Sequence, residues 1–476
     1  MSANRNKVYV IGVGMTKFIK PGKPESPDYP EMAREAITKA LIDANITYPT
    51  VESAFVGYCY GDSTAGQRAL YEVGATSIPI INVNNNCSTG SSALYLAHSA
   101  IAAGTAQVTL ALGFEKMAAG SLASVWQDRA NPLEPHLSVI SAKHDLDLRK
   151  PMAPTIFGLA GVEYCERKGI TSLDEQRLIM SKIAWKNHLH SVRNPYSQFR
   201  DEYTVEQIAK SRQVFGPLTM LQCCPTSDGS ACTVLASEEF VRANNLFPQA
   251  IEIGGIAMAT DSSDAFATYF TDRSETIPRE AVDFGKIAGA DMTRNAAARA
   301  LQMAQTPISA VRVVELHDCF SANELITTAA LGIADNACEF ASALEQRAHG
   351  VIGRGDAGQD VTINPSGGLI SKGHPLGATG LAQCAELTWQ LRGWCGDRQV
   401  PGTPQVALQH NLGLGGAAVV VVYKKPAVSG ADGAHWADPR NRFGYNPALV
   451  AHGVTDDDVK KVRGRAGDAA YLKSML

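Results

Sequence analysis

Short apolar runs alternate with longer stretches of helical periodicity through the first 115 residues. Continuous apolar runs are typical of buried strands, whereas apolar residues three and four positions apart indicate helices that cover a sheet. The pattern predicts strands at 8–14, 54–61, 78–85 and 107–115, and helices at 30–44 and 88–103. Such alternation is typical of an α/β protein.

The second half of the chain repeats this plan. The expected elements are strands at 250–260 and 311–320, helices at 291–305, 321–332 and, after the segment 361–368, 378–390, and a closing β-hairpin at 405–411 and 417–423. Both halves place a reactive residue between a strand and a helix. This arrangement suggests an old duplication, although the identity between the halves is too low to prove it.

Residues 116–245 interrupt the rhythm with a polar segment rich in His, Pro and aromatic residues. Within 143–212 there are 12 Lys and Arg against 9 Asp and Glu. Two interpretations stay open, a solvated helical insertion or a lid over an anionic ligand. The tail, 426–476, contains turn residues and a charged helix, and the sequence assigns it no function.

The amino-acid composition and net charge narrow the range of functions that the chain is expected to have. The 476 residues are 45% hydrophobic and 19% charged, with a formal net charge of -4. These values are typical of a globular protein with a sizeable core, and they favour neither nucleic acid nor a membrane surface as partner. No apolar run approaches the roughly 20 residues that a membrane span needs, and no signal-cleavage pattern is present. The C-terminal KSML is a poor peroxisomal signal.

Ten cysteines are present without a CxxC pair, so a zinc ribbon has little support. We expect free thiols in a reducing cytoplasm. Cys223 and Cys224, in LQCCPTSDG, are expected in a strand and turn beside the site and not on a metal. His188 and His190 are expected to belong to the surface or packing of the insertion.

The motif INVNNNCSTGSSALYLAH places Cys87 at the mouth of a helix. The first turn of that helix consists of small residues, Ser88, Thr89, Gly90 and Ser91. Unpaired N–H groups at a helix N-terminus carry partial positive charge, which favours a nucleophilic thiolate. The alternative is a buried structural cysteine, and the polar and small neighbours weigh against it.

Two further motifs carry imidazoles. VVELHDCFSANE brings His317 and Cys319, two residues apart, to the end of a strand, where either side chain can act as acid, base or hydrogen-bond donor. INPSGGLISKGHPLGATG surrounds His374 with small residues. His374 is either a base held by a rigid loop or an imidazole that faces solvent on a capped turn.

Two glycine-rich segments remain. QHNLGLGGAAV is a hairpin turn whose backbone N–H groups are alternatively available to an oxyanion. IGVGMTK lacks the third glycine of a dinucleotide fingerprint, so a nucleotide cofactor is not expected there.

Together these motifs resemble the thiolase superfamily, and closely the sterol carrier protein X type of thiolase. The resemblance runs from about residue 7 to 424. It implies a thiolase fold of two βαβαβαββ halves in five αβαβα layers, with an inserted loop domain. The implied boundaries are 1–115 and 220–249 for the first half, 116–219 for the loop domain, 250–425 for the second half, and 426–476 for the tail.

The resemblance also implies roles for single residues. Cys87 matches the acyl-accepting nucleophile, and His374 matches the base that activates it. His317 stands where most thiolases have an Asn that helps to hold a water in one oxyanion hole. Most thiolases take a second catalytic cysteine from a CxG motif that here reads Asn411-Leu412-Gly413, so Cys319 is assigned this acid/base role. The N–H groups of Cys87 and Gly413 are assigned to the other oxyanion hole.

The implied reaction is thiolytic cleavage of 3-oxoacyl-CoA to acetyl- or propanoyl-CoA and a shortened acyl-CoA. Coenzyme A is then a substrate, and no metal or permanently bound cofactor is expected. Its contact residues are not assigned. A homodimer or homotetramer is expected, without a fused lipid-carrier domain, and branched or steroid side chains are candidate substrates. The alternatives are Claisen condensation by a ketoacyl-synthase-like enzyme, and a non-catalytic lipid- or acyl-CoA-binding protein.

Overall fold

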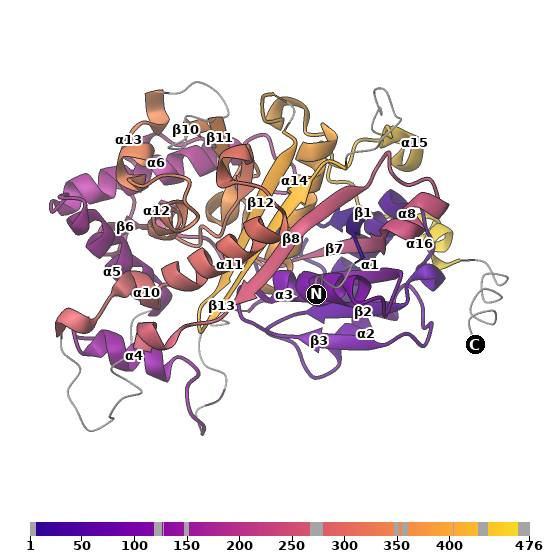
Figure 1. The fold of residues 1–476 in the computed structure, drawn as a ribbon, viewed down its shortest axis with the longest axis horizontal. Coiled ribbons are helices and arrows are strands. Elements are labelled where there is room, and N and C mark those ends of the chain that lie inside the picture. Colours follow the sequence, from indigo (N-terminus) through magenta and orange to yellow (C-terminus); the bar gives the residue numbers. More distant parts are fainter. Residues whose placement is uncertain are drawn as a thin grey trace.

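One mixed β-sheet runs through the computed structural model of the chain (Figure 1). The structure describes residues 6–118, 126, 128–146, 152–266, 279–346, 352–354, 360–402, 404–426 and 437–464. The sheet has eleven strands in the order β10-β11-β9-β12-β13-β8-β1-β7-β4-β2-β3. They are β1 (Val8–Met15), β2 (Ser53–Gly57), β3 (Ile80–Val83), β4 (Val108–Glu115), β7 (Gly229–Ser237), β8 (Ile251–Ala259), β9 (Val313–Glu315), β10 (Ile352–Arg354), β11 (Asp360–Ile363), β12 (Val406–Gly413) and β13 (Ala417–Lys424).

The sheet consists of two halves with the same internal pairing. In the first half β2 is parallel to β3 and β4, while β7 is antiparallel to β4 and β1. In the second half β9 is parallel to β11 and β12, while β13 is antiparallel to β12 and β8. Tyr9 pairs with Glu252 and Val10 with Ile251, which joins the halves through β1 and β8. The repeated order supports the duplication suggested by the sequence.

Helices cover both faces of each half. The main ones are α1 (Tyr29–Ala44), α2 (Ala65–Leu70), α3 (Thr89–Ala102), α8 (Glu238–Ala243), α11 (Ala290–Met303), α12 (Ser321–Ala330) and α14 (Leu376–Arg392). α3 and α14 pack together between the halves, α1 covers the outer face of the first half, and α11 that of the second. The result is an α/β/α/β/α arrangement.

Strand periodicity explains this layering. Along β1, Val8, Val10 and Val13 enter the core that contains α3 and α14, whereas Tyr9 and Ile11 enter the core under α1. Successive strand residues point to opposite faces, so a strand with apolar residues at every position is buried on both sides. All eight residues of β1 are buried.

The segment after β4 forms a helical unit beside the second half. It contains α4 (Glu134–Ser141), α5 (Met152–Arg167), α6 (Leu173–Ser191), α7 (Val205–Ala209) and the small hairpin β5 (Gln213–Phe215) and β6 (Leu218–Thr219). α5 and α6 pack against α12, and Lys186 on α6 forms a buried ion pair with Glu324 on α12 at 2.5 Å. This unit is therefore partly core rather than a fully solvated insertion. Its role as a lid stays a prediction.

Two sequence expectations differ from the structure. β9 has only three residues, because the chain leaves the sheet after Glu315 and places His317 beyond the strand end. β7 lies at the centre of the first half, although residues 116–245 showed no strand pattern. Its sequence, GSACTVLAS, is fully buried but begins with small residues in place of an apolar run.

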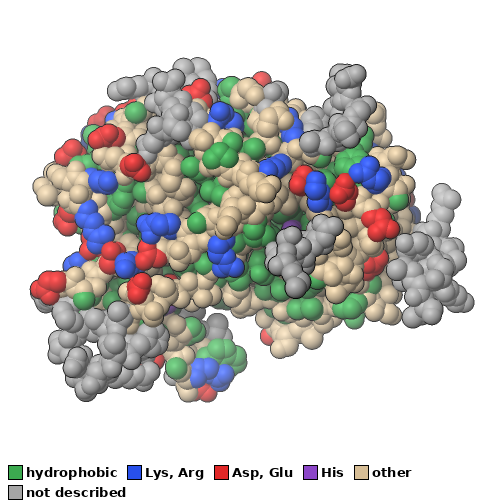
Figure 2. All heavy atoms as spheres, in the orientation of Figure 1, with side chains coloured by type: hydrophobic (Ala, Val, Ile, Leu, Met, Phe, Trp, Pro, Cys, Tyr) green, Lys and Arg blue, Asp and Glu red, His purple; other side chains and the backbone are tan. Residues whose placement is uncertain are grey.

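The remaining helices are short. α10 (Phe284–Ile287) and α13 (Ala337–Ser342) pack near the helical unit, and α15 (Arg440–Phe443) and α16 (Asp456–Arg463) lie in the tail, where Val462 of α16 joins the core under α1. Among the described residues, no helix combines the length and apolar character that a bilayer crossing requires. On the face in Figure 2, basic and acidic side chains are interspersed.

Candidate active site

Cys87 lies between β3 and α3, one residue before the helix N-cap. Asn86 turns the chain there with a φ of 51°. The Thr89 hydroxyl accepts a hydrogen bond from the Asn85 backbone N–H at 2.8 Å and so closes the turn. Gly413 packs against it, since a Cβ at Gly413 would lie 2.2 Å from the Asn85 carbonyl oxygen. The backbone of Gly413 is thereby held beside Cys87.

His317 and Cys319 follow β9, and the residue between them fixes this segment. The Asp318 carboxylate accepts hydrogen bonds from the backbone N–H groups of Leu369 at 2.7 Å and Ile370 at 3.3 Å. Leu369 and Ile370 belong to the π-helical turn Gly368–Lys372, which leads to His374. Asp318 therefore ties the HDCF segment to the glycine-rich segment.

His374 lies just before α14 with a defined tautomer. Its Nδ1 is 2.7 Å from the Thr379 hydroxyl, and that hydroxyl donates to the Pro375 carbonyl at 3.0 Å. Because Thr379 has one proton, His374 Nδ1–H must donate to it, which leaves Nε2 with a lone pair. His374 Nε2 is buried without a hydrogen-bond partner among the described residues. Burial lowers the pKa of His374 to about 3, so the ring is neutral.

Three of the predicted residues converge. The Sγ of Cys87 and one ring nitrogen each of His317 and His374 all lie within 4.8 Å of one another. The two imidazole rings are perpendicular, with centroids 5.1 Å apart. Gly377 lets the start of α14, which follows His374, lie against β4, because a Cβ there would lie 2.3 Å from the Phe114 carbonyl oxygen. A neutral base with a free lone pair therefore stands beside a thiol.

The electrostatics of Cys87 correct one expectation. The sequence predicts a thiolate stabilised by the N-terminus of α3, but burial and, to a smaller extent, the charge of Glu115 raise the pKa of the Cys87 thiol to about 12. Backbone N–H groups at Cys87 and Leu414 act in the opposite direction without outweighing burial. The resting site is therefore a neutral thiol beside a neutral imidazole, and the proton moves to His374 only when the thiol attacks.

This protonation state predicts the pH dependence of Cys87 alkylation. The rate with iodoacetamide in the free protein should rise about tenfold per pH unit between pH 7 and 10, because the thiolate fraction rises in that way below the pKa. Peptide mapping of Cys87 measures the rate, with the unfolded chain as the control that levels off near its ordinary thiol pKa. A plateau between pH 6 and 8 would contradict the neutral pair and indicate a resting thiolate.

Cys319 lies deeper than Cys87, with 6% of its surface exposed. It packs in the core that includes Phe157 and Phe320, and its sulfur does not join the group of atoms within 4.8 Å. Burial raises the pKa of Cys319 well above its usual value, and the Cys224 and Cys87 thiols raise it further. Cys319 is thus a protonated thiol in the electrostatic reach of Cys87.

The segment around Cys224 connects the two motifs, as the sequence predicted in placing it beside the site. The Cys224 N–H donates to the Cys319 carbonyl at 2.9 Å. β-bridges also join Cys223 to Phe320 and Thr226 to His374. Cys224 is therefore a further thiol at the site. His188 and His190, by contrast, are only 2% and 7% exposed. Of the two positions expected for them, they occupy the packed interior and not the surface.

Cys87, His317 and His374 also have the residue types and spacing of a metal site, for which thiolate and imidazole favour zinc. A metal there would occupy the lone pairs that acyl transfer requires. The absence of a resident metal stays a prediction.

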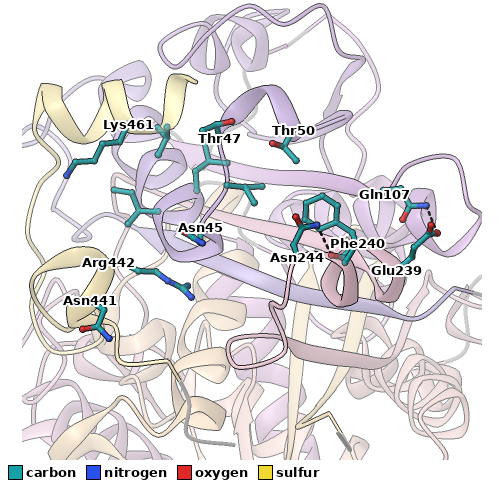
Figure 3. Close-up of a pocket in the computed structure, with 15 residues that line it drawn as sticks. Asn45, Thr47, Thr50, Gln107, Glu239, Phe240, Asn244, Asn441, Arg442 and Lys461 are labelled. Carbon is teal, nitrogen blue, oxygen red and sulfur yellow. Dashed lines mark hydrogen bonds between the residues drawn. The ribbon is translucent and has the colours of Figure 1, made fainter. Parts of the chain in front are cut away.

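One hollow among the described residues lies elsewhere. It has a volume of about 830 Å³ and lies between the end of α1, α8 and the tail, near Asn45, Phe240 and Arg442 (Figure 3). No cysteine or histidine lines it. The chemistry is therefore assigned to the cluster around Cys87 and not to this hollow.

Comparison with known families decides the identity of the site. Residues 8–239 match the thiolase N-terminal domain, and residues 280–425 match the thiolase C-terminal domain-like family. The chain belongs to the thiolase family. As a thiolase it is an acyltransferase, which favours this assignment over a ketoacyl synthase or a non-catalytic binding protein.

The relatives agree with the sterol carrier type. The thiolase is 53% identical over 421 residues to sterol carrier protein 2 of Oryctolagus cuniculus, covering 88% of this chain and 72% of that protein. It is 45% identical over 430 residues to non-specific lipid-transfer protein-like 2 of Caenorhabditis elegans, covering 89% of this chain and 97% of that protein. Both confirm the predicted sterol carrier protein X type.

Solved structures confirm the predicted fold class. Human mitochondrial 3-ketoacyl-CoA thiolase aligns with a TM-score of 0.60 at 19% identity, over 89% of this chain and 99% of that one. An Ltp2-ChsH2(DUF35) aldolase aligns with a TM-score of 0.67 at 19% identity, over 89% and 98%. At these identities the likeness shows the fold alone.

Glu115 is a site residue of this thiolase that the motifs did not reveal. It is buried and accepts hydrogen bonds from the N–H groups of Tyr60 at 2.8 Å and Gly377 at 2.9 Å. These bonds join the loop after β2 to the start of α14. Burial raises the pKa of Glu115 to about 7, so its negative charge grows through neutral pH and opposes ionisation of Cys87. An acidic residue closing the apolar strand LALGFE was the available signal.

Proposed function

We propose that this thiolase cleaves 3-oxoacyl-CoA by thiolysis. The observation that carries the proposal is the Cys87 thiol within 4.8 Å of a ring nitrogen of His374, whose Nε2 is buried without a hydrogen-bond partner in the described part of the chain. In the first step, His374 Nε2 accepts the thiol proton as Cys87 Sγ attacks the 3-keto carbon. The bond between C2 and C3 then breaks, leaving an acyl group on Cys87 and the enolate of acetyl- or propanoyl-CoA.

The second acid/base completes the cycle. Cys319 donates its proton to C2 of the enolate and becomes a thiolate. The incoming coenzyme A then gives its thiol proton to Cys319 and attacks the acyl carbon, and Cys87 leaves and recovers a proton from His374. Burial raises the pKa of Cys319 well above its usual value, so the thiol is protonated before the step and its proton is available to the strongly basic enolate.

Two oxyanion sites are part of the same proposal. The 3-keto oxygen becomes negative when Cys87 attacks, and the N–H groups of Cys87 and Gly413 are proposed to stabilise it. The close packing of Gly413 on the turn before Cys87 supports this placement. The thioester oxygen becomes negative in the enolate, and His317 is proposed to serve it.

Branched-chain and steroid side-chain 3-oxoacyl-CoA are the proposed substrates, on the basis of similarity to sterol carrier proteins. A thiolysis assay should compare acetoacetyl-CoA, a straight long-chain 3-oxoacyl-CoA, its 2-methyl derivative and a steroid 3-oxoacyl-CoA. We expect all classes to be cleaved, with kcat/KM highest for a 2-methyl or steroid substrate. Thiolysis of straight chains alone would overturn the substrate assignment, and no thiolysis at all would overturn the proposed function.

Coenzyme A is proposed as a substrate, with no permanently bound cofactor. The proposed compartment is the cytoplasm, and free thiols throughout support it. All ten cysteines are free, including Cys165 and Cys338, whose sulfurs are 3.8 Å apart in the interior.

The proposed assembly is a homodimer or homotetramer. β3 ends the sheet on one side, and its Ile81 is 48% exposed. An exposed edge strand offers unpaired backbone groups to a second chain. Sedimentation should give a dimer or larger at micromolar concentration, and a monomer would contradict the proposal.

A further inference from the structure

The imidazole of His317 contacts one side chain that the mechanism has not used. Its Nδ1 lies 3.0 Å from Nδ2 of Asn411 on β12. Both residues are buried, with exposures of 1% and 0%. Which of the two ring nitrogens carries the proton depends on whether Asn411 donates or accepts here, so the surrounding hydrogen bonds must decide.

A backbone carbonyl fixes the donor and acceptor directions of the surrounding hydrogen bonds. The amide nitrogen of Gln409, also on β12, lies 2.8 Å from the Gly380 carbonyl oxygen of α14. A carbonyl only accepts, so this atom of Gln409 must be the NH2 group. The same nitrogen is 2.8 Å from the Ser91 hydroxyl, and the Tyr423 hydroxyl donates to the Gln409 oxygen at 2.6 Å. The orientation of Gln409 is thereby fixed.

The hydrogen bonds of Ser91 fix the orientation of the Asn411 amide. The Ser91 hydroxyl accepts from Gln409 and donates its single proton to the Asn411 oxygen at 2.9 Å. The NH2 group of Asn411 must then face His317 and donate to Nδ1. A neutral His317 therefore carries its proton on Nε2. Burial lowers the pKa of His317 well below its usual value, which keeps the ring neutral.

We propose that Asn411, oriented by Ser91, is a positioning residue that holds His317 in the Nε2–H tautomer and so makes it the hydrogen-bond donor to the thioester oxygen. The inference rests on the proposed function. Ser91 belongs to the helix that Cys87 precedes, while Asn411 and His317 belong to the second half. The chain of hydrogen bonds thus links the nucleophile's helix in one half to the oxyanion donor in the other.

Gly380 leaves the space for this chain. A Cβ at Gly380 would lie 2.1 Å from the Ser91 hydroxyl and 2.7 Å from the Asn411 oxygen. The absence of a side chain at position 380 therefore lets α14 lie directly against the Ser91–Asn411 pair.

The Asn411→Asp substitution tests the proposal with little change in shape. A carboxylate only accepts, so it draws the ring proton to Nδ1, and Nε2 then carries a proton only while His317 is positively charged. The other titratable groups facing His317 are Cys87, His374 and His410. Burial raises the pKa of the Cys87 thiol to about 12 and lowers the pKa of both imidazoles to about 3, so all three are neutral near pH 7. The new carboxylate raises the pKa of His317 in the variant, so the ratio of variant to wild-type kcat should fall to about 10⁻² as pH rises through that pKa. KM should change little.

Two further variants separate positioning from folding. Ser91→Ala removes the donor to Asn411, so the amide can rotate, and we expect a smaller fall in kcat without the pH dependence. Thr293→Val is the matched control. It removes the hydroxyl 3.0 Å from Nε2 of His410, whose Nδ1 accepts from the His317 backbone N–H at 3.4 Å, and it leaves the bonds from Ser91 through Asn411 to the His317 ring in place, so kcat should be kept. If Asn411→Asp does not fold, the comparison of kcat in Ser91→Ala and in Thr293→Val replaces it. The proposal then requires a lower kcat in Ser91→Ala than in Thr293→Val.

Nitrogen NMR of ¹⁵N-histidine protein reads the tautomer directly, with His317→Gln used for assignment. The wild type should show His317 protonated at Nε2 and Asn411→Asp at Nδ1. A wild-type His317 protonated at Nδ1, or an unchanged pH profile and kcat in Asn411→Asp, would overturn the inference. The NMR result needs no turnover, so it is separate from failure of the proposed function.

Discussion

Replacing Cys87 with alanine should abolish acyl transfer. We expect thiolysis of acetoacetyl-CoA to fall by about 10⁴-fold or more, the scale of loss when a covalent nucleophile is removed. The physical reason is that the variant has no sulfur atom to attack the 3-keto carbon and to carry the acyl group. His374 then has no thiol proton to accept. Steady-state thiolysis measures turnover, and intact-protein mass spectrometry measures the acylated fraction.

The thiol at Cys59 provides the matched control. It donates to the Asn86 carbonyl at 3.3 Å and lies outside the cluster in which Cys87 meets His317 and His374, so it is near Cys87 but is not expected to be activated by the His374 base. Cys59→Ala should remain acylated at Cys87. Turnover within tenfold of wild type in Cys87→Ala would show that another residue is the nucleophile.

Replacing Cys319 with alanine should separate the two halves of the reaction. Turnover should fall by about 10³-fold, because the enolate loses its proton donor and coenzyme A its base. Cys87 and His374 remain, so Cys87 should still be acylated slowly by the substrate. The measurement is a single-turnover experiment that follows acylation and its reversal by coenzyme A separately.

A variant of the neighbouring Cys224 thiol tests whether the loss of turnover is specific to Cys319. Cys224 lies against Cys319 through the hydrogen bond to its carbonyl, so Cys224→Ser perturbs the same region while leaving the Cys319 thiol in place. We expect Cys224→Ser to keep most of its turnover. The assignment of Cys319 would be wrong if its alanine variant turned over normally, and would pass to Cys224 if only that variant stopped.

The fold was largely predictable because its core strands are apolar on both faces and its helices are amphipathic. The helix at 30–44 was expected and is observed at Tyr29–Ala44, and the closing hairpin pairs Leu408 with Val422 as its pattern implies. β7 was not predicted because small residues such as Gly229 and Ala231 occupy its buried start. Their burial follows from the close packing of neighbouring elements, which one segment does not encode.

The site was predictable as a set of residues but not as a set of protonation states. Cys87, His317 and His374 each carry a local motif, and the structure brings these three together. The thiolate at Cys87 was expected from the helix terminus alone, whereas its pKa depends on the burial of the whole site and on Glu115. The tautomer of His317 depends on a chain of bonds from Gly380, which no single motif contains.

The central claim is that the acyl group passes through Cys87. The most direct test mixes the wild-type protein with acetoacetyl-CoA in the absence of free coenzyme A, quenches with acid and maps the peptides by mass spectrometry. The account predicts an acetyl group on the peptide that contains Cys87, lost again when coenzyme A is added before the quench. An acetyl group on Cys319 or Cys224 in its place, or no acylated peptide while thiolysis proceeds, would contradict it.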